Sequence, residues 1–143
     1  MNGLITFLLR DGLHIPIGDS LGAKAIANWL GNDLQYSKGY VEEWLTRLAT
    51  LASRPGYQGT GNAFSVFSTG HVVLLENEYV EDQKVCASID SVSQALTCYR
   101  DFLDADNPSQ DVCTYEIPVS YLEEGPAARD HYQRAGGTFA ASE

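Results

Sequence analysis

The chain has 143 residues, 44% hydrophobic and 20% charged, which is enough to build one globular domain with its own core. Its formal net charge is −10, from 19 acidic and 9 basic side chains. Contacts to phosphate groups need clustered Lys and Arg, whereas the basic residues here are scattered along the chain. This composition argues against direct binding to nucleic acid or to an anionic membrane surface.

The excess negative charge is confined to one third of the sequence. Residues 1–75 carry five acidic and five basic side chains, and residues 125–143 carry two of each. Residues 76–124 hold twelve acidic side chains against two basic ones, so this segment alone supplies the net charge of −10. Such a segment promotes solubility, or it attracts a basic protein through a complementary potential. The second interpretation predicts that the unbalanced carboxylates lie on one side of the folded molecule.

Residues 4–17 have the pattern of a β-hairpin. The apolar runs Leu4–Leu9 and His14–Ile17 flank Asp11-Gly12, which is typical of a two-residue hairpin turn. Pro16 places the second strand at a sheet edge or at a strand end, because proline cannot donate a backbone hydrogen bond. The first apolar run is too short for a signal peptide or a membrane span, and we expect a cytoplasmic protein.

Two helices are predicted next. The first covers Leu21–Leu30, begins after a capping residue at Asp19 or Ser20, and ends at Gly31-Asn32. The second covers Lys38–Ser53, follows Ser37 as its cap, and has one apolar stripe at helical spacing. The tryptophan on each helix, Trp29 and Trp44, is expected to anchor the core.

The stretch 63–80 is predicted to be a central hairpin. The glycine-rich segment before it, residues 54–62, lacks the strand-to-helix order and the Lys of a phosphate-binding loop, and is expected to be a connection. Phe64–Phe67 alternates in polarity, Thr69-Gly70 suits a two-residue turn, and His71–Leu75 is apolar enough for a strand covered on both faces. This strand runs directly into four carboxylates, those of Glu76, Glu78, Glu81 and Asp82.

Three further elements are predicted after the hairpin. Lys84–Ile89 suits a strand, and a helix with apolar residues at helical spacing follows a cap at Asp90 or Ser91. Val112–Val119 suits an edge strand limited by its proline. Pro126–Ala135 suits a short helix.

Carboxylates also gather at the end of the predicted helix that follows Ser91. They belong to Asp101, Asp104, Asp106 and Asp111. A carboxylate near a helix C-terminus faces the negative end of the helix dipole, which costs up to about 1 kcal/mol at low salt. Because folding does not require them there, this placement argues that they serve a partner.

These elements predict an α+β fold in which an antiparallel sheet of hairpins packs against about three helices. We expect one domain over residues 1–143, with a core in 1–119 and a C-terminal extension in 120–143. The odd number and wide spacing of the three cysteines predict buried thiols rather than disulfides, and the cysteines and histidines lack the spacing of a zinc site. No motif of a catalytic nucleophile or metalloprotease is present, so we expect no enzyme activity, catalytic residue, metal or cofactor.

A further pattern extends from Phe7 to Phe102. It consists of Phe7 with Arg10-Asp11, Ser20-x-Gly22 leading to Trp29, the hairpin around Thr69-Gly70, and the run Tyr99-Arg100-Asp101-Phe102. In this pattern the chain resembles the YacL-like small acidic bacterial proteins, a group that includes immunity proteins of contact-dependent growth inhibition systems. The segment after Asp106 has no counterpart in the resemblance.

The resemblance implies an antidote that binds one toxin domain, often a nuclease, and blocks its active site or substrate groove. A nuclease that holds phosphates is basic, and an acidic antidote is its electrostatic complement. We therefore expect an immunity protein that forms a one-to-one heterodimer with the C-terminal domain of its cognate toxin. The expected toxin-binding residues are Glu76, Glu78, Glu81 and Asp82 with Tyr79 as an aromatic anchor, and, as a second patch, Asp101, Asp104, Asp106, Asp111 and Tyr115.

Two alternatives remain open at this point. One is a housekeeping YacL-like adaptor that binds another basic protein, and the other is an enzyme acting on a small molecule. A toxin gene directly upstream would favour the antidote over the adaptor.

Overall fold

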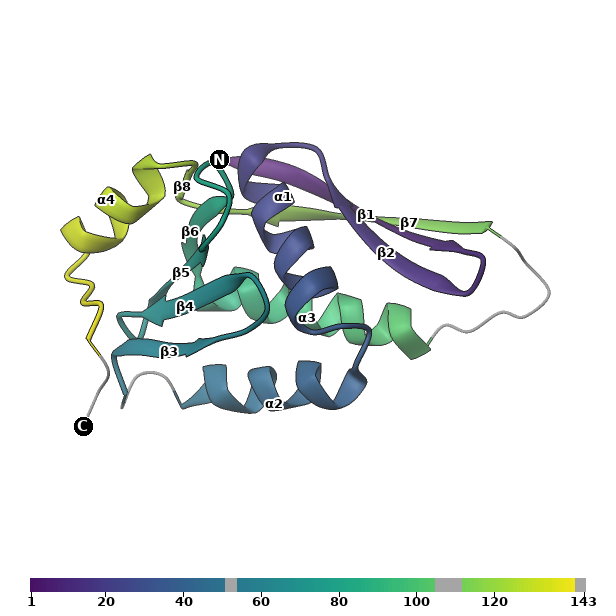
Figure 1. Ribbon diagram of the computed structural model, residues 1–143, viewed down its shortest axis with the longest axis horizontal. Coiled ribbons are helices and arrows are strands. Elements are labelled where there is room, and N and C mark those ends of the chain that lie inside the picture. The colour runs from purple at the N-terminus through teal and green to yellow at the C-terminus, as the bar shows by residue number, and fades with distance from the viewer. Residues whose placement is uncertain (51–53, 105–111, 141–143) are drawn as a thin grey trace.

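The computed structural model describes residues 1–50, 54–104 and 112–140, without the side chains of residues 112–114. These residues form two antiparallel sheets, four α-helices and one π-helical turn (Figure 1). The α+β class predicted from the sequence is confirmed. The strands are divided between two sheets, however, where the sequence suggested one.

The three-stranded sheet has the strand order β2-β1-β7, so a late strand pairs with the first one. Its strands are β1 (Asn2–Arg10), β2 (Leu13–Gly18) and β7 (Val112–Ser120). The predicted turn Asp11-Gly12 connects β1 to β2, with φ angles of 52° and 78° that suit a two-residue hairpin. Both β2 and β7 are edge strands, as their prolines predicted.

The five-stranded sheet has the order β3-β4-β5-β6-β8. Its strands are β3 (Gly56–Thr60), β4 (Phe64–Ser68), β5 (Val72–Asn77), β6 (Lys84–Ser88) and β8 (Glu123–Glu124). The expectation that residues 54–62 are only a connection is wrong, because β3 lies within them. This strand shifts register between Tyr57 and Gly59, where Gly59 has φ +146°. Glycine has a low strand propensity, so the pairing with β4 is what keeps these residues in a strand.

The central hairpin forms, with two differences from the prediction. The amide of Thr69 donates to the carbonyl of Val72 at 3.0 Å, so the turn residues are Gly70 and His71, one position later than expected. Gly70 has φ +100°, which suits the first central position of a hairpin turn. The second strand, β5, is covered on both faces as predicted, but β4 is buried on both faces as well.

The helices are α1 (Leu21–Asn28), α2 (Lys38–Ala49), α3 (Ile89–Asp104) and α4 (Ala127–Arg134), with the π-helical turn η1 (Trp29–Asp33) extending α1. The caps expected at Ser20 and Ser37 are present, and each hydroxyl accepts from a backbone amide at 3.2 Å. The cap of α3 is Ser88 instead of Asp90 or Ser91, since its hydroxyl accepts from the Ser91 amide at 3.1 Å.

The main core forms around α1, which contacts both sheets (Figure 1). Trp29 is buried, and Trp44 packs edge-on against it with 5.5 Å between ring centroids, which fits the core role predicted for both. Cys86 and Cys98 are free thiols. Burial raises the pKa of Cys86 to about 12, so this thiol is chemically inert at neutral pH.

A smaller core lies on the other face of the five-stranded sheet, where α4 packs. Its buried members are Phe67, Leu74, Cys86, Ala128 and Tyr132. The Tyr132 hydroxyl donates to the carbonyl of Thr138 at 2.7 Å, and the amide of Tyr57 donates to the carbonyl of Ala140 at 3.0 Å. The segment expected as a C-terminal extension is therefore part of the packed structure up to residue 140. None of the helices in the described ranges is long and apolar enough to cross a membrane.

One close approach gives a direct test of this packing. A Cβ atom on Gly18 would lie 2.2 Å from the backbone of Ala23 and Lys24, so β2 and α1 can meet there only at glycine. We expect Gly18→Ala to lower the free energy of unfolding by at least about 2 kcal/mol, because backbone atoms must move apart.

Gly39→Ala is the matched control for this change. Gly39 lies in the first turn of α2, and an added Cβ would meet only the Ser37 hydroxyl, at 3.7 Å. This variant should gain about 0.5–1 kcal/mol from helix propensity. Urea unfolding of both variants measures the two effects, and equal stabilities would contradict the close packing of β2 on α1.

Candidate interaction site

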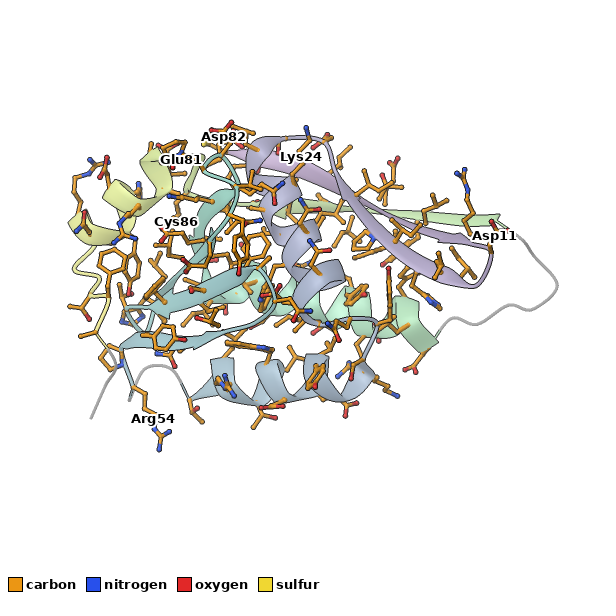
Figure 2. All side chains as sticks on the ribbon, in the orientation of Figure 1. Asp11, Lys24, Arg54, Glu81, Asp82 and Cys86 are labelled. Carbon is orange, nitrogen blue, oxygen red and sulfur yellow. The ribbon has the colours of Figure 1, made fainter. Side chains whose placement is uncertain are left out.

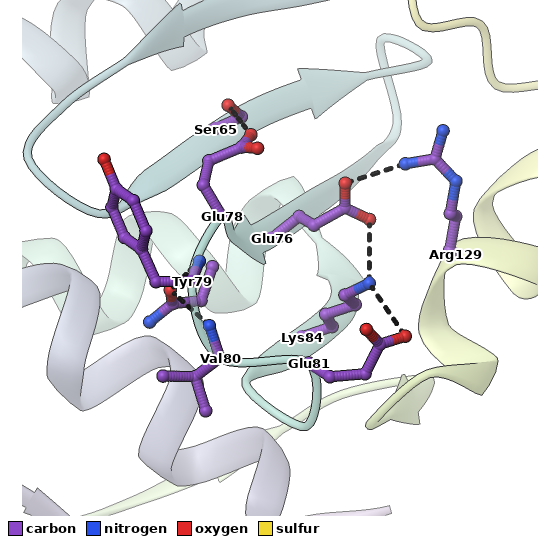
Figure 3. A network of polar contacts seen from close by, with 9 residues as sticks. Ser65, Glu76, Glu78, Tyr79, Val80, Glu81, Lys84 and Arg129 are labelled. Atoms are coloured by element: carbon purple, nitrogen blue, oxygen red, sulfur yellow. Dashed lines mark hydrogen bonds and ion pairs between the residues drawn. The ribbon is translucent and has the colours of Figure 1, made fainter.

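The loop between β5 and β6, residues 78–83, is held in shape by the buried side chain of Asn77. The Asn77 Oδ1 atom accepts hydrogen bonds from the backbone amides of Tyr79 at 2.8 Å and Val80 at 3.0 Å (Figure 3). Its Nδ2 atom donates to Oε1 of Gln83 at 2.9 Å. Asn77 is only 6% exposed, so these bonds are formed away from water.

Backbone hydrogen bonds fix the same loop at both ends. The amide of Glu78 donates to the carbonyl of Ala63 at 2.7 Å, and the amide of Asn77 donates to the carbonyl of Gln83 at 3.0 Å. Within the loop, the amide of Gln83 donates to the carbonyl of Val80 at 3.1 Å. A loop ordered in this way loses little conformational entropy when it binds a partner.

The tip of this loop presents an aromatic side chain beside two carboxylates. Tyr79 is 81% exposed and Val80 is 43% exposed. Glu81, with a side chain 80% exposed, and the exposed Asp82 follow directly. We call residues 79–82 the acidic tip. An exposed aromatic on an ordered backbone suits an anchor for a protein partner, and the carboxylates suit a basic rim around its socket.

Glu78 lies at the start of the loop and points back toward the sheet. The hydroxyl of the buried Ser65 donates to its Oε1 atom (Figure 3). Glu78 is an exposed residue, but its carboxylate therefore has a hydrogen-bond partner within the fold.

Glu76 is not part of the expected rim, because its carboxylate lies inside the molecule. The residue is 8% exposed, its Oε1 atom lies 2.7 Å from Nη1 of Arg129, and its Oε2 atom lies 3.7 Å from Nζ of Lys84 (Figure 3). The Arg129 guanidinium also lies 3.9 Å from the ring centroid of Phe139. Glu76 thus ties α4 and the segment after it to the five-stranded sheet.

The second predicted patch is only partly free for a partner. Asp104 forms an ion pair with Lys38 at 3.1 Å, which joins the end of α3 to the start of α2. The idea that folding does not use this carboxylate is therefore wrong. Asp101 is exposed, and its Oδ1 atom lies 3.7 Å from the Nε atom of Arg100. Tyr115 is 45% exposed and stacks on Phe7 with 5.9 Å between centroids. The other two predicted members, Asp106 and Asp111, lie outside the described residues.

The two patches do not form one acidic surface. Glu81 and Asp82 lie on the loop between β5 and β6, in the upper left part of Figure 2. The C-terminal end of α3 lies far from them, toward the tip of the β1–β2 hairpin (Figure 1). The expectation that the unbalanced carboxylates share one side is wrong for the described residues. The acidic segment runs along β6, α3 and β7, and these elements spread it over the length of the molecule.

A cavity of about 280 Å³ lies between α2, η1 and the β3–β4 connection. Its charged side chains, those of Asp33, Glu43 and Arg47, already have partners in the fold. Arg47 donates to the carbonyl of Gln58 and to Glu43, each at 3.0 Å, and the Asp33 carboxylate accepts from the amides of Ala63 and Phe64, each at 3.0 Å. Burial raises the pKa of Asp33, while these amides lower it. These hydrogen bonds hold the Asp33 carboxylate against the end of the glycine-rich segment and indicate that Asp33 has a structural role.

Metal binding is not supported by the residues that the structure describes. Within those ranges no group of three or more His, Cys, Asp or Glu side chains could hold a metal ion.

Asn77 is the residue that sequence reasoning missed. It lies between the carboxylates of Glu76 and Glu78, and the predicted site was based on those charges. Its signal was available, because an Asn side chain often hydrogen-bonds the backbone two or three residues further on and so initiates a turn.

Comparisons with known proteins gave no significant match. They found no matching family model, no matching curated protein and no matching solved structure.

The interior position of Glu76 gives a test that separates it from the acidic tip. We expect Glu76→Gln to lower the free energy of unfolding by about 1–3 kcal/mol, because it removes the anion that the partly buried Lys84 and Arg129 share. Lys84 then retains the exposed Glu81 carboxylate, at 3.9 Å. Glu81→Gln, at an exposed position, should leave stability nearly unchanged. Thermal unfolding measures the stability of both variants. Equal losses of stability would contradict the interior position of the Glu76 carboxylate.

Proposed function

We propose that this protein binds a basic protein domain through the acidic tip, and that it acts as an immunity protein for a cognate toxin. The observation that carries the proposal is Tyr79, 81% exposed on a loop that Asn77 holds in one conformation. An aromatic side chain exposed to water in this way has no role in the described core. A partner that covers the Tyr79 side chain would account for this exposure.

The charges around Tyr79 favour a basic partner. Glu81 and Asp82 flank the apolar tip, and the whole chain carries a net charge of −10. Long-range attraction would speed the encounter with a cationic domain, and the two flanking carboxylates would orient it. A toxin nuclease has the required positive surface, since it must hold phosphate groups. Binding over its substrate groove would neutralise it in a one-to-one complex without any catalytic residue on this chain.

An adaptor that binds another basic protein is the second candidate. The same tip would serve it, so the two functions differ in the identity of the partner. The reading frame directly upstream distinguishes them: a toxin-bearing gene supports the antidote, and its absence favours the adaptor.

Co-expression with the C-terminal domain encoded directly upstream tests the antidote function. We expect the wild-type protein to restore growth and to co-purify with that domain. Tyr79→Ala should raise the dissociation constant by about 30-fold or more, because truncation of a central aromatic anchor typically costs at least about 2 kcal/mol. Tyr40→Ala, which removes a tyrosine 51% exposed on α2, should bind as wild type does.

The two parts of this experiment fail separately. Absence of rescue and of co-purification by the wild-type protein would overturn the antidote function. Rescue with undiminished binding by Tyr79→Ala would keep the function and remove the acidic tip as its site.

Association kinetics test the electrostatic part of the proposal. We expect the association rate with the same domain to fall steeply as salt rises, and Glu81→Gln with Asp82→Asn to lower it about threefold to tenfold at low salt. Asp11→Asn with Glu42→Gln is the matched control, since it removes two exposed charges elsewhere on the molecule. Stopped-flow measurements in which both pairs behave alike would leave the acidic tip without a steering role.

A further inference from the structure

The three-stranded sheet has one face that carries an apolar patch and that no described element covers. We call it the outer face, the side turned away from α1 and α3, which pack on the other side (Figure 1). Side chains alternate along each strand, so the buried Ile5, Phe7 and Leu9 belong to the inner face. The outer face carries Leu4, Leu8, Leu13, Ile15, Ile17 and Pro118.

Exposure and sequence pattern both mark the outer face as unusual. Leu4 is 41% exposed, Leu13 is 52% exposed and Ile17 is 49% exposed. Antiparallel sheets with one face in water normally carry polar residues on that face. The outer positions of β2 are instead Leu13, Ile15 and Ile17, and β1 adds Leu4 and Leu8 beside its polar outer residues Asn2, Thr6 and Arg10. Contiguous apolar area of this kind marks an interaction surface.

The charge of this face indicates what covers it. By residue type, the strand positions on it carry one positive charge, from Arg10, and one negative charge, from Glu116, which sum to zero. The chain as a whole carries −10, so two copies repel each other wherever their acidic parts approach. On the outer face two copies meet without opposing net charges. A cationic partner, in contrast, finds no net negative charge on this face and is attracted more strongly by the acidic tip.

We propose that the outer face is a homodimer interface, in which the three-stranded sheets of two copies pack face to face as a six-stranded sandwich. A sheet of three strands, the longest of nine residues, measures about 30 Å by 14 Å, and a second sheet would lie about 10 Å away. The aliphatic contacts come from β1 and β2, where Leu4 and Leu8 lie on either side of Thr6. Glu116 lies on the edge strand β7, where its carboxylate can reach water at the rim.

Dimerisation by this face has a salt dependence of distinctive sign. Two copies of charge −10 repel at long range, and salt screens that repulsion. The dimer should therefore tighten as salt rises, whereas the complex with a basic partner should weaken. The two interactions can be separated by this opposite response alone, so the dimer does not depend on the proposed function.

Sedimentation of the purified full chain over a range of concentrations and salt tests the proposal. We expect the wild-type protein to reach twice its chain mass of 15.6 kDa. Ile17→Lys should raise the dimer dissociation constant by at least about 100-fold, because each dimer would bury two unpaired ammonium groups. Tyr40→Lys is the matched control, since it places a lysine at a site 51% exposed on α2 and should leave the dimer intact.

Three outcomes would overturn the dimer. A wild-type protein that remains monomeric at all concentrations contradicts it whatever the variants do. An Ile17→Lys variant that folds, as judged by circular dichroism, and still dimerises places the interface elsewhere. A monomer in which Ile17→Lys abolishes binding to the upstream-encoded domain would assign the outer face to that partner instead. Should Ile17→Lys fail to fold, the milder Ile17→Thr and the salt response of the wild-type protein decide the question.

Discussion

The constraint on which the structure depends is the burial of the five-stranded sheet on both faces. The core around α1 covers one face and α4 covers the other, so β4 and β5 are buried along most of their length. Polar groups at the end of β5 must then find partners inside the protein. Asn77 finds them in the backbone of the loop that follows, and Glu76 finds them in Lys84 and Arg129. Two neighbouring polar residues therefore serve different ends: one orders the acidic tip, and the other holds α4.

The molecule presents two surfaces of opposite physical character. The acidic tip is small, charged and ordered, and it suits a basic partner met through long-range attraction. The outer face carries an aliphatic patch and has no net charge by residue type, and it suits a second copy that is otherwise repelled by charge. The two proposals use different residues on different elements. A dimer through the outer face would leave each acidic tip with its own binding partner.

Much of the fold could be predicted from local patterns. The turn at Asp11-Gly12, the caps at Ser20 and Ser37, and the edge positions of the prolines each depend on a few neighbouring residues. The turn at Gly70-His71 and the cap at Ser88 are local errors of one or a few positions. Two larger errors come from strand pairing, which local residue patterns do not reveal. Glycine-rich β3 forms because β4 pairs with it. The division into two sheets arises because β7 returns to pair with β1 at the other end of the chain.

The site shows the same division. The amino-acid sequence alone established the α+β class, the order of most elements, the neutral and acidic segments, and Tyr79 with its flanking carboxylates as a candidate anchor. Only the tertiary structure decided which carboxylates reach solvent. It enclosed Glu76 between two cations, paired Asp104 with Lys38, and separated the end of α3 from the β5–β6 loop. The physical reason is that charge is a property of residue type, whereas exposure depends on which distant elements pack around the residue.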